Sequence, residues 1–124
     1  MAKGRFDQRA ALPLRHRELE NVVVLYATQA MLGLIGPSVE AVAVELRPER
    51  LVVHFALGRL TDAERDDIED VMGDLDALLG NEDLNGEWKL PAHWRVEPEL
   101  HVGPPDEAWP GCSHRRVFER RPRE

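Results

Sequence analysis

Residues 41–57 read AVAVELRPERLVVHFAL, and this stretch decides the fold. Apolar side chains alternate along both halves, and the central RPER places proline at the second position of a four-residue turn, where its fixed φ is favoured. Alternation with a period of two is typical of a strand that buries one face. The stretch therefore predicts a β-hairpin. Both alternating sets of residues 51–57 are largely apolar, so at least one face of this second strand is expected to be fully covered.

The segment before the hairpin has a helical pattern. From about Glu18 to Ile35, apolar residues recur every three to four positions, and Gly36-Pro37 supplies a stop. The run Val22–Val24 would also start a strand, but the periodic stretch is longer than strands usually are, so we expect a helix. Residues 1–17 are basic and lack a periodic pattern, which predicts a loosely held arm or a short ordered extension.

The segment after the hairpin, residues 61–79, predicts a second helix. Thr61 and Glu64 have the spacing of a capping box, in which each side chain satisfies a backbone donor of the first turn. One stripe at helical spacing is apolar and is expected in the core: Ile68, Val71, Met72, Leu75, Leu78 and Leu79.

The last third of the chain predicts two further strands. A polar connector over 80–91 precedes an alternating strand from Trp94 to Val102, and a Pro-rich loop over 103–111 precedes a short strand over 115–121. Pro98 cannot donate to a ladder, which favours an edge or a bulge. The element order is helix, strand, strand, helix, strand, strand. Short-connection rules then predict an α+β fold: a mainly antiparallel four-stranded sheet with two packed helices, forming one domain over 18–124 after the arm 1–17.

Composition and charge narrow the class of protein. Cys112 is the single cysteine, so no internal disulfide is expected and an oxidising compartment offers no advantage. The N-terminal residues do not resemble a signal peptide, and the longest apolar run, over 22–35, is too short to span a bilayer. We expect a cytoplasmic protein that does not enter membranes and needs no cofactor.

The net charge of −7 is concentrated in the second predicted helix, where eight acids face one base, Arg65. Placing the residues at 100° per position puts the acids opposite the apolar stripe or on its flanks. An exposed row of carboxylates steers a basic partner, although charge runs often only keep a helix solvated. The candidate partner-binding residues are Asp62, Asp66, Asp67, Glu69, Asp70, Asp74 and Asp76.

Two groupings have the residue types of catalytic or metal sites. Cys112-Ser113-His114 places possible nucleophiles beside an imidazole, but the sequence offers no oxyanion site or third orienting group, so a surface thiol is the preferred interpretation. His93 and His101 share the polar side of a predicted strand with Glu97 and Glu99, yet eight residues span roughly 26 Å, too far for one ion. His16, His54 and His114 are expected to be ordinary surface or core histidines. No catalytic or metal-binding residues are therefore assigned.

Nucleotide and nucleic-acid binding are not supported either. The glycines do not assemble into a phosphate-binding fingerprint. The basic C-terminal segment is accompanied by a single aromatic, Phe118, in a chain that is acidic overall, so direct nucleic-acid binding is not expected. An alternative role for its arginines is to balance the acidic helix within the molecule.

Residues 29–42, QAMLGLIGPSVEAV, resemble the opening of a set of small bacterial proteins of toxin-immunity loci, of the kind found in contact-dependent inhibition or polymorphic toxin systems. The resemblance continues through Phe55 and Gly58, the acidic segment 61–70 and the close Phe118-Glu119-Arg120-Arg121, and it covers about residues 22–121. The stretch Gly58–Leu60 departs from the pattern, which has an acid after the glycine. The resemblance implies a protein that neutralises a cognate toxin by binding it.

The resemblance and the acidic helix together predict an immunity-type inhibitor, not an enzyme, that captures a cognate protein toxin. We expect the toxin to be a basic nuclease, because carboxylates at helical spacing can occupy contacts that a nuclease makes to phosphates. The alternative is a small-ligand-binding protein or enzyme with a pocket between sheet and helices, near His54, His93 or Cys112. The oligomeric state is not predicted.

Overall fold

The predicted hairpin is present in the computed structural model of the chain, which describes residues 2–33, 35–48, 50–79 and 95–120. Strand β1 (Val39–Arg47) pairs antiparallel with β2 (Arg50–Leu57). Arg47 lies opposite Arg50, so the loop has two residues, and a register shift interrupts the ladder near its far end, between Val39 and Ala41. The hairpin prediction is confirmed.

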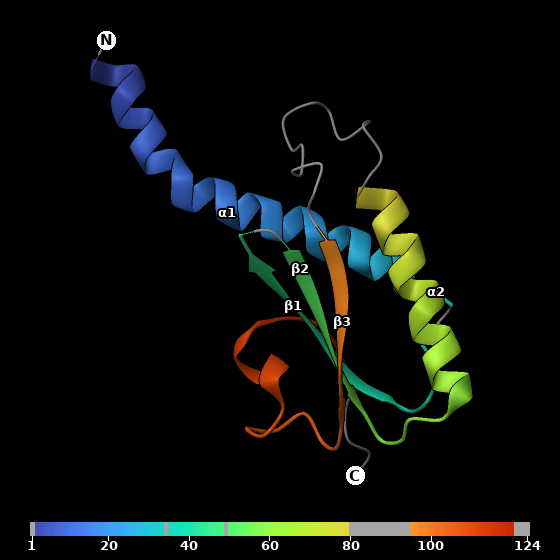
Figure 1. Cartoon of the computed structure of the whole chain (residues 1–124). Coiled ribbons are helices and arrows are strands. Elements are labelled where there is room, and N and C mark those ends of the chain that lie inside the picture. Colours follow the sequence, from blue (N-terminus) through green and yellow to red (C-terminus); the bar gives the residue numbers. More distant parts are fainter. Residues whose placement is uncertain (1, 34, 49, 80–94, 121–124) are drawn as a thin grey trace.

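Helix α1 (Ala2–Met31) is longer than predicted at its N-terminal end. It begins at Ala2 and not near residue 18, because the basic segment, although it contains Pro13, is rich in arginine, alanine and leucine, which are good helix formers. It ends at Met31, a turn before the predicted stop, because Gly33 takes a left-handed conformation with φ of 78° and closes the helix. The second half of α1 lies along the sheet, whereas the first half projects beyond it (Figure 1).

Helix α2 (Asp62–Leu79) begins where the capping box predicts. The backbone N–H of Thr61 donates to Oε1 of Glu64 over 2.8 Å, and the Thr61 hydroxyl donates to the same oxygen. The predicted apolar stripe faces the core, with its central members Ile68, Val71 and Leu75 buried.

The sheet is mixed, so the prediction of a mainly antiparallel sheet is wrong. Strand β3 (Arg95–Val102) runs parallel to β2, whereas β4 (Arg115–Glu119) is antiparallel to β1. The strand order across the sheet is β3-β2-β1-β4. The cause is α2: a helix between β2 and β3 carries the chain back to the end at which β2 began, so the next strand must run in the same direction.

The predicted element order also lacked a short 3-10 helix, η1 (Pro110–Ser113), which lies between β3 and β4. Strand β3 is an edge strand, as Pro98 indicated. The predicted connector over 80–91 lies outside the described residues, and so does the end of the last predicted strand, at residue 121.

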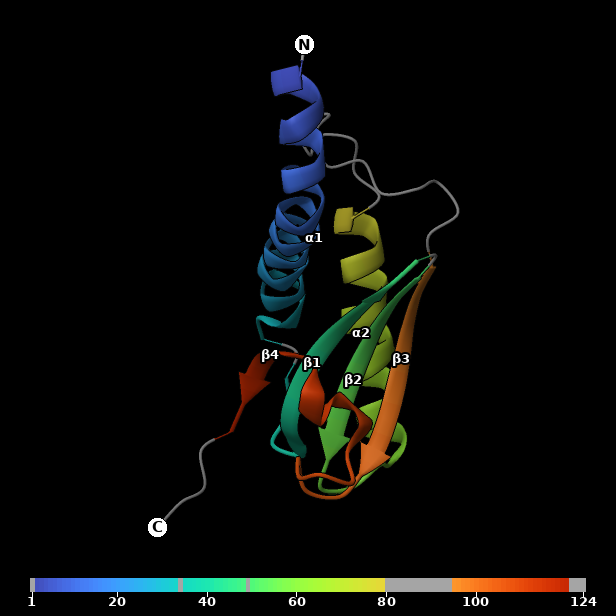
Figure 2. The same cartoon turned by 90° about the vertical axis from the view of Figure 1, so that its left-hand side faces the viewer.

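The two faces of the sheet are covered differently (Figures 1 and 2). Helices α1 and α2 pack on one face, and aliphatic side chains of both helices join those of β1 and β2 in the main core. The segment after β3 folds over the other face, where Trp109 packs on Ala41, Ala43 and Ala56. Strand β2 is therefore buried on both sides along Leu51–Leu57.

Within the described residues, no helix has both the length and the apolar character required to cross a membrane. The longest apolar run of the sequence belongs instead to α1, where Val23, Ala27, Ala30 and Met31 pack into the core.

Candidate functional site

Helix α2 places most of the predicted partner-binding acids in solvent. Because its apolar stripe is held against the sheet, the opposite side of the helix must face outward. Six of the seven acids are exposed and one, Asp67, is half-buried. The exposed set is called the acidic face of α2 below and comprises Asp62, Asp66, Glu69, Asp70, Asp74 and Asp76.

The acidic face of α2 carries one base, Arg65, and forms no ion pair within the described part of the chain. None of its carboxylates forms one of the ion pairs found there. The arginines of the C-terminal segment are engaged elsewhere: Arg115 pairs with Glu20 at 3.0 Å and Arg116 with Glu119 at 2.6 Å. The idea that these two arginines balance the acidic helix is therefore wrong.

Arg120 is held by backbone oxygens. Its guanidinium donates to the carbonyls of Val39 and Gly36, both over 3.1 Å, and it lies over the ring of Phe118. The charge of Arg120 thus fastens the end of β4 to the start of β1, and none of the three described arginines of this segment neutralises α2.

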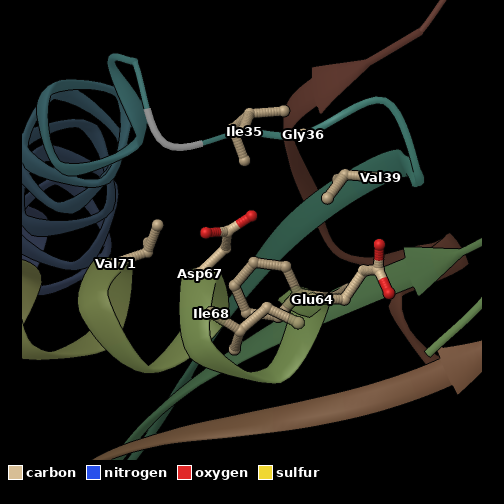
Figure 3. A pocket seen from close by; sticks show the side chains of 8 residues that line it. Ile35, Gly36, Val39, Glu64, Asp67, Ile68 and Val71 are labelled. Carbon is tan, nitrogen blue, oxygen red and sulfur yellow. The ribbon is translucent and has the colours of Figure 1, made fainter. Parts of the chain in front are cut away.

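Asp67 and Glu64 face inward from α2 and border a small cavity between the helix, the sheet and the segment after α1 (Figure 3). The cavity measures about 10 Å³, roughly the space of one water molecule, whereas ligand sites occupy hundreds of Å³. Its lining is otherwise apolar: Ile35, Gly36, Val39, Phe55, Ile68 and Val71. The cavity gives no support to a small-ligand pocket between sheet and helices.

The Glu64 carboxylate belongs to the structure of the helix start. The Thr61 hydroxyl and N–H donate to it, Ser38 donates over 3.0 Å and Arg59 lies 3.4 Å away. These contacts, the Thr61 bonds foremost, lower the pKa of Glu64 to about 2. Glu64 is therefore charged at neutral pH but is not available to a partner.

A second group of titratable side chains, which the sequence did not predict, lies on the opposite face of the sheet. Nε2 of His54 is 2.8 Å from Oε1 of Glu45, and Nε2 of His114 is 3.3 Å from the same oxygen. The two imidazoles stack with their centroids 5.2 Å apart and their planes 7° from parallel. His54 is buried, with 3% of its surface exposed, and His114 is half-buried. These three residues are called the Glu45–His54–His114 cluster.

Arg47 completes the surroundings of Glu45. Its Nε donates to Oε2 over 2.6 Å and its Nη2 donates to Oε1 over 3.3 Å, so Oε1 is shared by Arg47 and the two histidines. The Arg47 hydrogen bond, assisted by His54 and His114 and opposed by burial, lowers the pKa of Glu45 to about 2. The cluster therefore holds a fixed negative charge between two imidazoles and a guanidinium.

Close packing beside the cluster fixes the chain that carries His114. A Cβ at Gly111 would lie 2.5 Å from the Trp109 ring and 2.6 Å from Cβ of His54, so only glycine fits there. The Arg116 guanidinium also lies over the Trp109 ring, 5.0 Å from its centroid.

The two groupings that the sequence offered as catalytic or metal sites do not form such sites among the described residues. In the described residues no hydrogen bond joins Cys112 or Ser113 to His114, whose ring instead faces Glu45. His93 lies outside the described residues, and Glu97 pairs with Arg50 at 3.2 Å. His101 does not belong to the Glu45–His54–His114 cluster, the group of possible metal ligands that the described residues bring together.

The pairing of Glu45 with His54 could have been predicted from the sequence. A two-residue hairpin loop fixes the register, which places Glu45 and His54 on the same face in diagonal positions. The prediction that His54 is an ordinary isolated histidine did not use this register. His114 had no such signal, since its position depends on how the long segment after β3 folds over the sheet.

Comparison with known families finds a match that covers more than half of the chain. Residues 20–90 match the family model described as MafI2 immunity protein. The matched range contains the acidic face of α2 and two members of the cluster, Glu45 and His54, but not His114. No curated protein matches the chain.

Proposed function

The chain belongs to the MafI2 immunity protein family, and from this membership we propose that it neutralises a cognate toxin by binding it through the acidic face of α2. The inhibitor acts as a bound partner and not as an enzyme. The observation that carries this choice of surface is the row of exposed carboxylates that lack a basic partner in the described part of the chain.

Electrostatics favours this surface over the others. Arg115 and Arg116 already form ion pairs within the molecule, and Glu64 and Glu45 are held by their own partners. The acidic face of α2 can instead exchange water for Lys and Arg of another protein without breaking an internal ion pair. Complementary charge of this kind accelerates association and selects against wrong partners.

The acidic face of α2 is also held in a fixed position by the fold. The capping box fixes the start of α2, and the buried stripe holds its far side on the sheet. Carboxylates one turn apart are then separated by roughly 6 Å along the axis, and little backbone order has to be gained on binding. A basic active site, such as that of a nuclease, is the partner that such a row fits best, because the carboxylates would replace substrate phosphates.

Charge reversal tests the proposed surface. Asp66→Lys with Asp70→Lys should abolish capture of the co-expressed cognate toxin, because each central charge pair that is broken costs about 2–5 kcal/mol of binding. The matched control, Glu18→Lys with Glu107→Lys, makes the same change in net charge at exposed positions without ion pairs in the described structure. Undiminished capture by the first variant, or equal loss in both, would remove α2 from the interface.

The nuclease assignment needs a separate measurement. If the toxin binds nucleic acid with the surface that α2 covers, a short DNA or RNA duplex should compete with the inhibitor for the toxin, and the competition should weaken with salt. Simultaneous binding of duplex and inhibitor would exclude phosphate mimicry while leaving toxin neutralisation intact. The proposed place of action is the cytoplasm. With one cysteine the chain cannot form an internal disulfide, so an oxidising compartment would not stabilise it.

A further inference from the structure

Three segments that are distant in sequence bring metal-ligand atoms together behind the sheet. Glu45 comes from β1, His54 from β2, and His114 from the turn between η1 and β4. One oxygen of Glu45 and one ring nitrogen of each histidine lie within 4.8 Å of one another. Each histidine directs Nε2 at the same carboxylate oxygen, and the two imidazoles lie stacked beside each other.

Two of the three separations between the ligand atoms are close to those found around a small divalent ion. In a tetrahedral zinc site with bonds of roughly 2.0–2.1 Å, neighbouring ligand atoms lie roughly 3.3 Å apart. The His114 and Glu45 atoms are already 3.3 Å apart, and the His54 and Glu45 atoms, at 2.8 Å, need to separate by only a few tenths of an ångström.

The chemistry of the donors fits the same class of ion. Two imidazoles and one carboxylate are the protein ligands of many zinc sites that keep an open position, and they also suit other borderline first-row cations. Calcium and magnesium prefer sites made of oxygens. We propose that Glu45, His54 and His114 form a binding site for a divalent cation of the zinc class, with its fourth position open to water.

The surroundings hold the carboxylate ligand in place. Arg47 donates to Oε2 of Glu45 over 2.6 Å and, through Nη2, to Oε1 over 3.3 Å, and it orients the carboxylate as an outer-shell partner does in metal sites. An ion on Oε1 would replace the longer of these two bonds. Nδ1 of His54 is buried and has no hydrogen-bond partner in the described residues. Ligation through Nε2 puts the proton on Nδ1, which costs the missing hydrogen bond, so the affinity should be lower than that of a closed structural zinc site.

Occupancy would have a structural consequence. Since His114 follows η1, the ion would join the segment over 103–114 to the hairpin at a point where Trp109 already packs. Binding to the folded state alone raises its stability by mass action, so zinc should raise the melting temperature. The cluster is on the opposite face of the sheet from α2, and its test needs no toxin.

The experiment is calorimetric titration of the chelator-treated full-length protein with zinc chloride. The wild type should bind one ion per chain. His114→Gln should bind roughly 100-fold more weakly or not at all, since loss even of an outer-shell partner costs 10–100-fold. His114 is half-buried, so its replacement should leave the fold intact by circular dichroism. Glu45→Gln provides a second variant that keeps the shape of the side chain but removes the anionic ligand.

His101→Gln is the matched control because His101 is the other histidine for which the structure describes a side chain, and it lies outside the cluster. It should keep wild-type zinc affinity and the zinc-dependent rise in melting temperature, both of which His114→Gln and Glu45→Gln should lose. Absence of saturable binding, or wild-type affinity in both cluster variants, would overturn the proposal.

Discussion

The two acidic regions of this molecule use carboxylates in opposite ways. On the acidic face of α2, six carboxylates project into water and form none of the ion pairs found in the described structure. Behind the sheet, the single carboxylate of Glu45 contacts two imidazoles and a guanidinium. The charge of Glu45 contacts three other side chains, whereas the six carboxylates of the acidic face of α2 form no ion pair within the described residues.

This difference distinguishes residues that stabilise the fold from residues that are free to bind a partner. Substitution of a residue with internal contacts removes those contacts and lowers the free energy of unfolding. A residue without internal contacts can be replaced with little loss of stability. The comparison therefore predicts that perturbing the close packing around Trp109 lowers the free energy of unfolding, and that perturbing the acidic face of α2 alters binding with little change in stability.

The largest effect is expected at Trp109, which is 1% exposed and packs on the sheet beside the cluster. Trp109→Ala should lower the free energy of unfolding by about 3–5 kcal/mol, the usual cost of deleting a buried aromatic side chain. Urea denaturation measures it. Trp109→Phe is the control: the indole N–H has no partner in the described structure, so phenylalanine should lose much less. A loss below about 1 kcal/mol for the alanine variant would mean that this segment contributes little to the fold.

A smaller loss is expected at Gly111, where no side chain fits between Trp109 and His54. Gly111→Ala should cost about 1–3 kcal/mol through overpacking, again by urea denaturation. Gly73→Ala is a suitable comparison, because a Cβ at this exposed helical position meets nothing within 4 Å and alanine favours helices. Equal stability of the wild type and Gly111→Ala would show that the close approach of Gly111 to its neighbours is easily relieved.

The sequence predicted the parts of the fold that depend on local pattern. The hairpin follows from alternation around Arg47–Arg50, and α2 follows from its cap and its apolar stripe. The direction of β3 was wrong because it was taken from the rule for short connections, although an 18-residue helix precedes it and makes the connection a crossover. The contact of Trp109 with the far side of the hairpin could not be predicted, since no local period encodes it.

The candidate sites divide in the same way. Helical geometry alone assigns the acidic face of α2, because positions opposite a buried stripe must be exposed. The pairing of Glu45 with His54 was accessible from the hairpin register, but the arrival of His114 beside them depends on a segment that crosses the sheet after β3.

The next prediction concerns how stability depends on pH through Glu64, the acid at the start of α2 that has partners within the molecule. The pKa of Glu64 is lowered to about 2, from an ordinary value of 4.5, chiefly by hydrogen bonds from Thr61. The unfolded state therefore binds the proton more readily, so the stability that charged Glu64 confers is present above pH 4.5 and is lost as the pH falls toward 2. Glu45 contributes in the same window.

Glu64→Gln keeps a residue that suits the capping box but removes the charge. It should be less stable than the wild type at pH 7, and the difference should shrink between pH 4.5 and pH 2, as measured by urea midpoints across that range. Glu69→Gln removes a carboxylate from the acidic face of the same helix and serves as the control. A gap between wild type and Glu64→Gln that is constant with pH would contradict the assignment of this stabilisation to the charged carboxylate.

The smallest effect on stability should come from the residues that matter most for the proposed function. Asp66→Asn with Asp70→Asn should change the free energy of unfolding by less than about 0.5 kcal/mol, because neither side chain is buried or ion-paired in the described structure. Relief of the repulsion between the acids of this face offsets part of any loss. The same variant should bind the toxin more weakly. A protein that unfolds readily after this change would show that the acids support the helix, and weaker toxin binding could then no longer be assigned to lost contacts.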